Sequence, residues 1–360
     1  MNRIFNFSAG PATMPIEVLK KAQEELLNFD FSGMSVMEMS HRSKSFENVL
    51  ERAKSGIISL LNVPDNYDVL FIQGGASLQF SMVAKNLFQN ELPALAINTG
   101  SWAQKAIKEI KKEGICNVIA SSEDKNFSYL PDLSNCSYEK SSFTYLCSNN
   151  TIFGTQFKSF PDTGDSPLVA DMSSDILSRP LNINQFGVIF AGAQKNIGPS
   201  GIAIVIIRKD LAERAKESLP SMLQYRSYIS SNSLYNTIPT FQVYMTALVA
   251  EWLQVQGGLT AIQKYNQDKA NLLYDAIDNS DFYYSPVNPE DRSLMNVVFR
   301  ISGGEELEKL FVKEATEAHL SGLKGHRSVG GLRASIYNAH PREGVEALVS
   351  FMNTFKDKHA

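Results

Sequence analysis

Cysteine, long apolar runs and excess charge are all scarce in this sequence of 360 residues. Its three cysteines, Cys116, Cys136 and Cys147, show neither metal-ligand nor redox spacing, and their odd number argues against a disulfide framework. No stretch approaches the roughly eighteen apolar residues of a membrane-spanning helix. Residues 1–15 also lack the apolar core of a signal peptide. We therefore expect a soluble, cytoplasmic protein with reduced cysteines.

Neither sign of charge dominates the chain. The 34 lysines and arginines and 38 acidic residues leave a formal net charge of −4. This balance argues against a general nucleic-acid-binding protein, and no basic cluster is long enough to suggest a membrane-surface patch. Only five histidines occur, and no group of histidine, cysteine and carboxylate residues has metal-ligand spacing. The expected partners are therefore small molecules, with no metal, nucleic acid or membrane.

Short apolar runs alternate with amphipathic stretches through the first two thirds of the chain. Such alternation predicts an α/β domain with a mostly parallel, seven-stranded sheet flanked by helices. The expected strands are residues 69–72, 95–98, 118–120, 143–147, 168–170, 188–190 and 202–207. The expected helices are residues 15–29, 45–61, 78–87, 102–112 and 239–256.

The pair Gly257-Gly258 ends the last of these helices and begins a second part of the chain. A long helix, two short strands and two further helices are expected there, which is the pattern of a smaller α/β domain. These elements are residues 259–278, 297–301, 305–319, 333–337 and 341–356. The predicted organisation is an irregular arm (1–14), a large domain (15–256) and a small C-terminal domain (257–360).

One stretch, from Phe190 to Pro199, lies between two expected strands and contains a single cation, Lys195. The connection is about ten residues long, which is short for a parallel crossover, so its flanking strands are expected to be antiparallel neighbours. Its glycines and alanines let the backbone approach a ligand closely. A lysine among small apolar residues loses hydration, which lowers its pKa and makes the amine a usable nucleophile. A lone lysine on a loop is usually only solvated, so other stretches of the sequence must decide whether Lys195 has a chemical role.

Three other expected strands are followed by residues of a similar kind. Asp171 ends one strand, Trp102 follows another, and the turn Gly74-Gly75-Ala76-Ser77 joins a third to a helix. Individually these would be a capping aspartate, a core tryptophan and an ordinary glycine turn. The carboxyl ends of parallel strands meet at one edge of a sheet, so these residues are expected to gather there. A lysine, a strand-end aspartate, an aromatic ring and a glycine-rich helix start are together typical of a pyridoxal-phosphate site.

Several long blocks of sequence make a family resemblance specific. The blocks are Phe5 to Ala12, Ser40 to Ser43, Ala191 to Pro199, Leu234 to Thr240, and Gly325 to Ser335. They are distributed from the first fifth of the chain to the last. In these blocks the chain resembles the phosphoserine aminotransferase family, which is a class V branch of the fold-type I pyridoxal-phosphate enzymes.

The resemblance implies amino transfer between L-glutamate and 3-phosphohydroxypyruvate, which gives O-phospho-L-serine and 2-oxoglutarate in serine biosynthesis. Some bacterial members also form 4-phosphooxy-L-threonine in pyridoxine biosynthesis, so both substrates are candidates. The spacing alone supports only a pyridoxal-phosphate enzyme. The alternatives are another class V enzyme, such as an alanine–glyoxylate-type aminotransferase or a cysteine desulfurase, and a non-catalytic nucleotide-binding module built on Gly74-Gly75. A desulfurase needs a reactive cysteine on a mobile loop, and none of the three cysteines lies in an obvious one.

The resemblance also implies how the cofactor would be held. Lys195 would bind it covalently, and Asp171 would pair with its pyridine nitrogen. Trp102 would stack on the ring, and the hydroxyl of Thr151 would bond to the ring's 3-oxygen. The residues that would bind the cofactor's phosphate are Ala76, Ser77, Gln194, Asn236 and Thr237. The last two come from the partner subunit in this family, so a homodimer with shared active sites is expected. Some members carry arginine where this chain has Ser77, so one positive charge is absent here.

The substrate would be recognised mainly by cations. Arg333 matches the family's clamp for the α-carboxylate, where a planar guanidinium can form two parallel hydrogen bonds. Two His-Arg pairs would contact the distal phosphate or carboxylate, together with a serine near the N-terminus. These residues are His41, Arg42, His326, Arg327 and Ser8.

Overall fold

Seven strands form one sheet in the computed structural model, which describes residues 3–89 and 91–360. The strand order is β2-β8-β7-β6-β5-β3-β4. Strand β8 is antiparallel to both β7 and β2, and all pairs from β7 to β4 are parallel. The predicted fold class and the antiparallel strands on either side of Lys195 are therefore confirmed. The bounds are β2 (Tyr67–Gln73), β3 (Ala94–Asn98), β4 (Cys116–Ser121), β5 (Phe143–Cys147), β6 (Leu168–Asp171), β7 (Val188–Gly192) and β8 (Ile202–Arg208).

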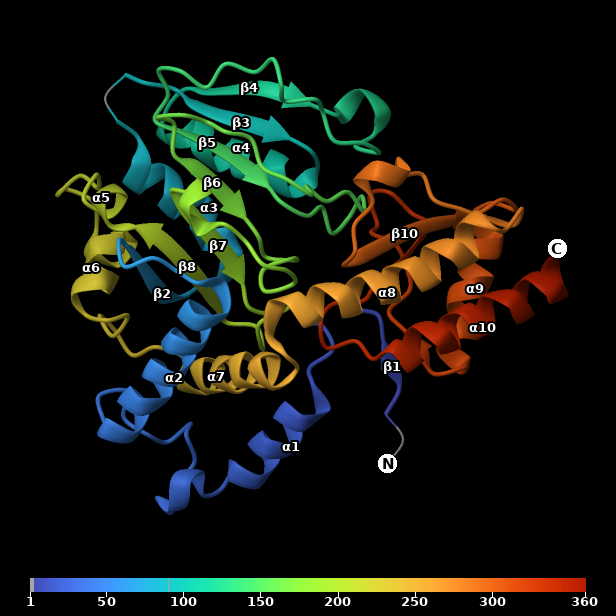
Figure 1. Ribbon diagram of the computed structural model, residues 1–360, viewed down its shortest axis with the longest axis horizontal. Helices are drawn as coiled ribbons and strands as arrows, with labels where there is room; N and C mark the ends of the chain where they lie inside the picture. Colours follow the sequence, from blue (N-terminus) through green and yellow to red (C-terminus); the bar gives the residue numbers. More distant parts are fainter. Residues whose placement is uncertain (1–2, 90) are drawn as a thin grey trace.

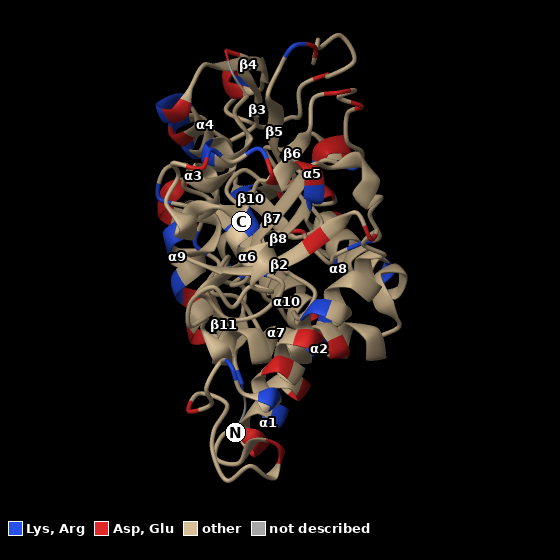
Figure 2. Ribbon diagram, turned by 90° about the vertical axis from the view of Figure 1, so that its left-hand side faces the viewer, with Lys and Arg blue, Asp and Glu red and all other residues tan. Residues whose placement is uncertain are grey.

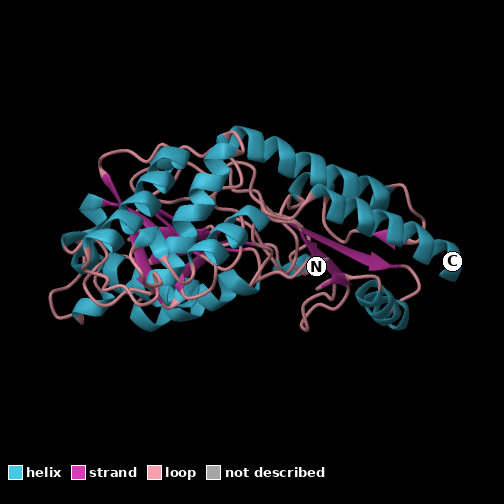
Figure 3. Ribbon diagram, turned by 90° about the horizontal axis from the view of Figure 1, so that it is seen from below, coloured by secondary structure: helices cyan, strands magenta, loops and turns pink. Residues whose placement is uncertain are grey.

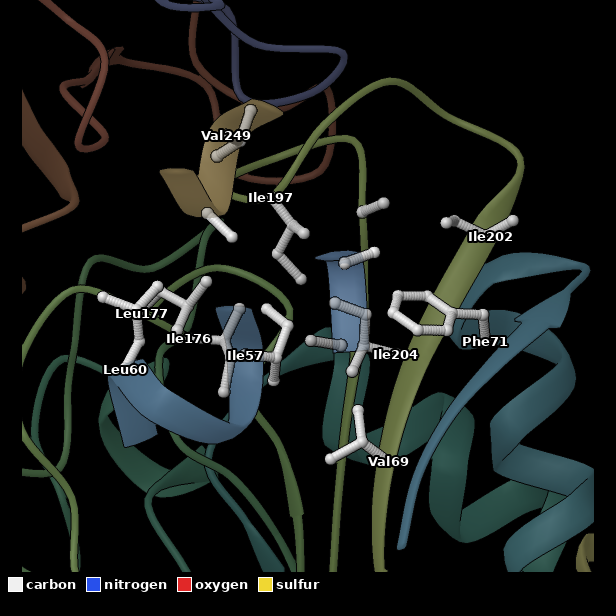
Figure 4. Close-up of a cluster of buried hydrophobic side chains, with 14 of the residues drawn as sticks. Ile57, Leu60, Val69, Phe71, Ile176, Leu177, Ile197, Ile202, Ile204 and Val249 are labelled. Atoms are coloured by element: carbon white, nitrogen blue, oxygen red, sulfur yellow. The ribbon is translucent and has the colours of Figure 1, made fainter. Parts of the chain in front are cut away.

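Helices cover both faces of this sheet because successive side chains of a strand point to opposite sides. Val69 and Phe71 of β2 pack in a core with helices α2 and α7, whereas Leu70 and Ile72 pack in another core with α3 and α4. Figure 4 shows Val69 and Phe71 in the first core, with Ile57 from α2 in the same cluster. The bounds are α1 (Ile16–Glu25), α2 (Lys44–Leu61), α3 (Gly75–Leu87), α4 (Ser101–Glu113), α5 (Lys209–Ala212), α6 (Tyr225–Ser230) and α7 (Thr240–Val255).

The C-terminal part has a sheet and a core of its own (Figures 1 and 3). Its antiparallel sheet has the order β12-β10-β9. Two very short strands in this part, β9 and β11, were missed by the sequence analysis. The predicted domain boundary lies at the junction of α7 and α8. The bounds are α8 (Gly258–Asp278), β9 (Tyr283–Tyr284), β10 (Asn296–Ile301), α9 (Glu305–Glu317), β11 (Leu320–Ser321), β12 (Leu332–Ser335) and α10 (Arg342–His359).

The N-terminal arm is less irregular than expected. Strand β1 (Phe5–Asn6) pairs in parallel with β11, and the Phe7 side chain is fully buried in the C-terminal core. Further along, the Ala12 N–H donates to the Gln194 carbonyl at 2.9 Å. The prediction of an irregular arm was therefore wrong for Phe5 and Asn6, because a sheet partner far along the chain orders them. The arm connects the C-terminal part to the segment that carries Lys195.

An exposed apolar segment follows the first helix, which ends at Glu25 instead of continuing to residue 29. Leu27 is 83% exposed and Phe31 is 95% exposed.

Figure 2 shows acidic and basic residues interspersed along the helices of the molecule. In the described ranges, no helix combines the length and the hydropathy that a membrane span requires.

Candidate active site

The predicted residues meet at the carboxyl-terminal edge of the large sheet. Asp171 is the last residue of β6, and Lys195 lies in the turn that follows β7. Trp102 lies in the first turn of α4, shortly after β3, and Ala76 lies in the first turn of α3, after β2. Because β2 and β3 run in the same direction as β6 and β7, all four connections leave the sheet at one edge.

Lys195 is half-buried, and its amine is held by a neighbouring hydroxyl. The Nζ atom donates to Thr151 Oγ1 at 2.7 Å and lies 5.4 Å from the centroid of the Trp102 ring. Burial lowers the pKa of Lys195, and the negative charge of Asp171 partly opposes that shift. A lowered pKa leaves more of the amine neutral, which is the form that attacks a carbonyl carbon.

Asp171 is a buried carboxylate with a fixed orientation. It is 4% exposed, and its Oδ1 atom accepts from the Ser173 N–H at 2.9 Å and the Ser173 hydroxyl at 2.6 Å. Burial raises the pKa of Asp171, whereas the charge of Lys195 and the two bonds from Ser173 lower it. The Ser173 hydroxyl also accepts from the Gly192 N–H at 3.0 Å. The sequence analysis missed Ser173, although a serine two residues after an aspartate is a known side-chain turn pattern.

The start of α3 forms a cradle in which side chains leave room for an anion. Gly74 has a φ of 93°, and a Cβ atom there would lie 2.8 Å from Leu78 Cδ2, so only glycine fits. A Cβ atom on Gly192 would lie 2.8 Å from Gln194 Oε1 and 3.4 Å from Ala76 Cβ, which places Gln194 beside this helix start. The first N–H groups of a helix have no intrahelical partner and attract anions.

Arg333 reaches the same site from β12. Its Nη1 atom donates to the Thr151 carbonyl at 3.2 Å, so Thr151 connects Arg333 to Lys195. Burial lowers the pKa of Arg333. Its Nε atom is buried and has no hydrogen-bond partner among the residues described. A buried guanidinium with donors left over is suited to a carboxylate ligand.

The two His-Arg pairs lie in different surroundings. His326 is half-buried near Arg333, and burial together with the charges of Arg333 and Arg327 lowers its pKa. By contrast, Arg42 is exposed, and His41 Nε2 is buried without a partner in the described part of the chain. Among the described residues, no hydrogen bond or ion pair joins His41 or Arg42 to Lys195.

Four remaining predicted residues lie at the margins of the site. The Ser8 N–H donates to Asn6 Oδ1 at 3.0 Å, within the arm that crosses the lysine segment. Ser77 is exposed on the first turn of α3. Thr237 is also exposed, whereas the Asn236 amide lies 3.4 Å from Gln73 Oε1, immediately before the glycine turn.

Two of the three cysteines are poorly placed for sulfur chemistry, and Cys136 is the partly exposed one. Cys116 and Cys147 are buried, and burial raises the pKa of Cys116 to about 11 and that of Cys147 well above its usual value. A reactive cysteine is an accessible thiolate, so this environment argues against a desulfurase. In the ranges 3–89 and 91–360, no three histidine, cysteine or acidic side chains form a metal-binding group.

Comparison with known proteins defines first a class and then a family. Residues 4–348 match the family described as aminotransferase class-V. The phosphoserine aminotransferase of Geobacillus kaustophilus is 55% identical over all of both chains, and that of Listeria monocytogenes is 54% identical over 99% of this chain and 97% of its own.

Solved structures agree with this result. That of phosphoserine aminotransferase from Bacillus circulans subsp. alkalophilus has a TM-score of 0.98 at 52% identity and covers 99% of each chain. The structure of PLP-bound phosphoserine aminotransferase from Trichomonas vaginalis has a TM-score of 0.93 at 40% identity, over 98% of this chain and all of its own. The chain therefore belongs to the phosphoserine aminotransferase family within the class V aminotransferases, which confirms the resemblance seen in the sequence blocks. An alanine–glyoxylate aminotransferase from Nostoc, at 14% identity, shares the fold alone.

Proposed function

We propose that this protein transfers an amino group from L-glutamate to 3-phosphohydroxypyruvate, with pyridoxal phosphate as its cofactor. The products are O-phospho-L-serine and 2-oxoglutarate. One observation carries the proposal. The Thr151 hydroxyl accepts a hydrogen bond from the Lys195 amine, and the Thr151 carbonyl accepts one from the Arg333 guanidinium. A nucleophilic amine and a carboxylate clamp thus lie on either side of one residue. Full-length similarity to phosphoserine aminotransferases supports the choice of substrates and a cytoplasmic role in serine biosynthesis.

The residues around Lys195 fit pyridoxal phosphate in charge and in shape. The glycine cradle at α3 and the side chain of Gln194 suit the phosphate, and the buried carboxylate of Asp171 suits a protonated ring nitrogen. When bound, pyridoxal phosphate supplies a carbonyl carbon for the amine and a ring that accepts an electron pair. We assign the flat side chain of Trp102 to the face of that ring and the hydroxyl of Thr151 to its 3-oxygen.

The chain's own groups would move one proton and hold one carboxylate. Lys195 would hold the cofactor, and its Nζ atom, once an incoming amino acid has released it, would take the proton from the substrate α-carbon. The lowered pKa of Lys195 suits this exchange, because a general base works best near the operating pH. Arg333 holds the α-carboxylate so that this proton faces the amine. Asp171 keeps a negative charge opposite the ring nitrogen.

The distal phosphate requires a second cationic group. His326 and Arg327 lie on the turn that precedes β12, so the strand that carries Arg333 also presents this pair to the substrate. We propose that they bind the distal phosphate of the oxo acid or the distal carboxylate of glutamate. Ser77 stands where some family members have arginine. The turn with His326 and Arg327 therefore has a larger share in recognising the distal anion here.

We further propose a homodimer in which each site is completed by the partner. Phe31 is 95% exposed in the apolar segment just before His41 and Arg42, and Thr237 is exposed beside the helix start of α7. An exposed apolar segment of this kind is typical of an interface between subunits. In a two-fold dimer, burying it would bring the first His-Arg pair and the Asn236-Thr237 pair toward the other subunit's site.

The experiment that tests the function is a substrate panel on the purified protein. We expect rapid amino transfer from glutamate to 3-phosphohydroxypyruvate, slow transfer to pyruvate and glyoxylate, and none in the Lys195→Ala variant. Including 4-phosphooxy-L-threonine as an amino donor decides whether the pyridoxine-pathway reaction also occurs. Faster transfer to glyoxylate than to the phosphorylated acid would refute the proposed substrate and favour the alanine–glyoxylate alternative.

A further inference from the structure

The turn from Gly325 to Gly331 is tied mainly to itself. The Gly325 N–H donates to the Gly331 carbonyl at 2.9 Å, and the N–H groups of Val329 and Gly330 both donate to the His326 carbonyl at 2.9 Å. Within the ranges that the structure describes, no hydrogen bond or ion pair joins residues 326–330 to another element. Polar contacts therefore shape this turn but do not position it on the protein.

Open space lies on one side of the turn. A cavity of about 630 Å³ separates it from α9, and its walls include Glu305, Glu308 and Val312 from that helix. The two glycines at the end of the turn have φ values of 72° and 68°, a conformation that allows a sharp change of direction. The turn is therefore not packed against α9, and it joins the following strand through permissive backbone at Gly331, which lies close to Arg300 of β10.

The turn has an apolar anchor in Val329, which also borders this cavity. Val329 is half-buried and packs against a small cluster formed by Phe127, Ile152 and Phe153, and Trp102 packs against the same cluster. This cluster is separate from the three larger cores. Its residues follow β4 and β5 of the large sheet, and Ile152 is the neighbour of Thr151 in the chain. Val329 thus fastens a turn of the C-terminal part to a platform beside the active site.

We propose that Val329 is a specificity-determining positioning residue, whose packing on the Phe127–Ile152–Phe153 platform holds His326 and Arg327 toward the distal anion of the substrate. The inference rests on the proposed role of this turn in binding that anion. Without the anchor, the turn spends part of its time over the cavity. The apparent affinity for a phosphorylated substrate then falls in proportion to the fraction of molecules whose turn is in place. The apparent affinity for a substrate without a distal anion does not change.

The experiment compares Val329→Ala with Val312→Ala in the holoenzyme. Both variants lose the same two methyl groups from the lining of the cavity, but only Val329 also packs on the platform. With O-phospho-L-serine, we expect KM to rise about tenfold in Val329→Ala, a change equivalent to about 1.4 kcal/mol. We expect kcat to stay within about twofold, and the kinetics with L-alanine to stay unchanged. Val312→Ala and Val329→Ile should both behave like the wild type.

A second readout does not depend on activity. Arg327 is exposed, and trypsin should cleave after it faster when the turn leaves the platform, because cleavage requires the backbone to open locally. Mass spectrometry should therefore detect faster cleavage there in Val329→Ala than in the wild type or in Val312→Ala. Unchanged cleavage, or equal losses with O-phospho-L-serine and L-alanine, would overturn the inference. Arg327→Ala separates it from the proposed function. If that variant keeps the wild-type KM for O-phospho-L-serine while Val329→Ala is cleaved faster, the anion-binding role fails but the anchor stands.

Discussion

Replacing Asp171 by asparagine should remove a charge without disturbing the site's shape. The Oδ1 atom of an asparagine can still accept the two hydrogen bonds from Ser173, at 2.9 and 2.6 Å in the native protein. The side chain is 4% exposed, so water cannot replace the lost charge. Removing one partner of a buried charge pair costs about 3–5 kcal/mol. That range corresponds to a loss in kcat of roughly two to four orders of magnitude.

The assay is single-turnover reaction of the holoenzyme with O-phospho-L-serine, followed by the cofactor's absorbance. Asp175→Asn is the matched control, because Asp175 is also buried, 3% exposed, and accepts from Gln156 at 3.1 Å. Burial raises the pKa of both carboxyl groups. We expect the control to keep most of the activity. Near-normal turnover in Asp171→Asn, or an equal loss in Asp175→Asn, would show that the charge of Asp171 has no special role.

Three other predictions follow from the same structure. Borohydride reduction of the holoenzyme, followed by peptide mapping, should place the cofactor label on Lys195, and a label on any other lysine would refute its assignment. Mixing Lys195→Ala with an Asn236→Ala/Thr237→Ala double variant under subunit exchange should restore activity, because one site of the mixed dimer is then intact. If no activity returns although subunit exchange is confirmed, the shared site is refuted. His340 is 1% exposed, and burial lowers its pKa to about 3. Between these pH values His340 is neutral in the folded protein but binds a proton in the unfolded chain. The contribution of neutral His340 to the free energy of unfolding is therefore fully present above about pH 6.5 and is lost as the pH falls toward 3. Denaturant titrations should show a loss of about 1.4 kcal/mol per pH unit in this window that His340→Gln lacks, and identical slopes would exclude His340 as the cause.

The predicted sheet and the gathering of a few site residues at its edge depended on local sequence, whereas most of the predicted site came from the family resemblance. Apolar runs such as Ile202 to Ile207 are buried on both faces of a sheet, so their composition shows strands without any tertiary information. The rule that parallel strands end at one edge then placed Lys195, Asp171 and Trp102 near one another.

Contacts between distant segments were decided only by the tertiary structure. The pairing of Phe5 with Leu320 orders an arm that has no strand pattern of its own. Thr151 connects Lys195 to Arg333 across segments of the chain that share no local pattern. Likewise, nothing in the sequence around Val329 shows that it packs on residues some two hundred positions earlier. Local patterns report which face of an element is buried, whereas the partner of that face depends on how the whole chain closes on itself.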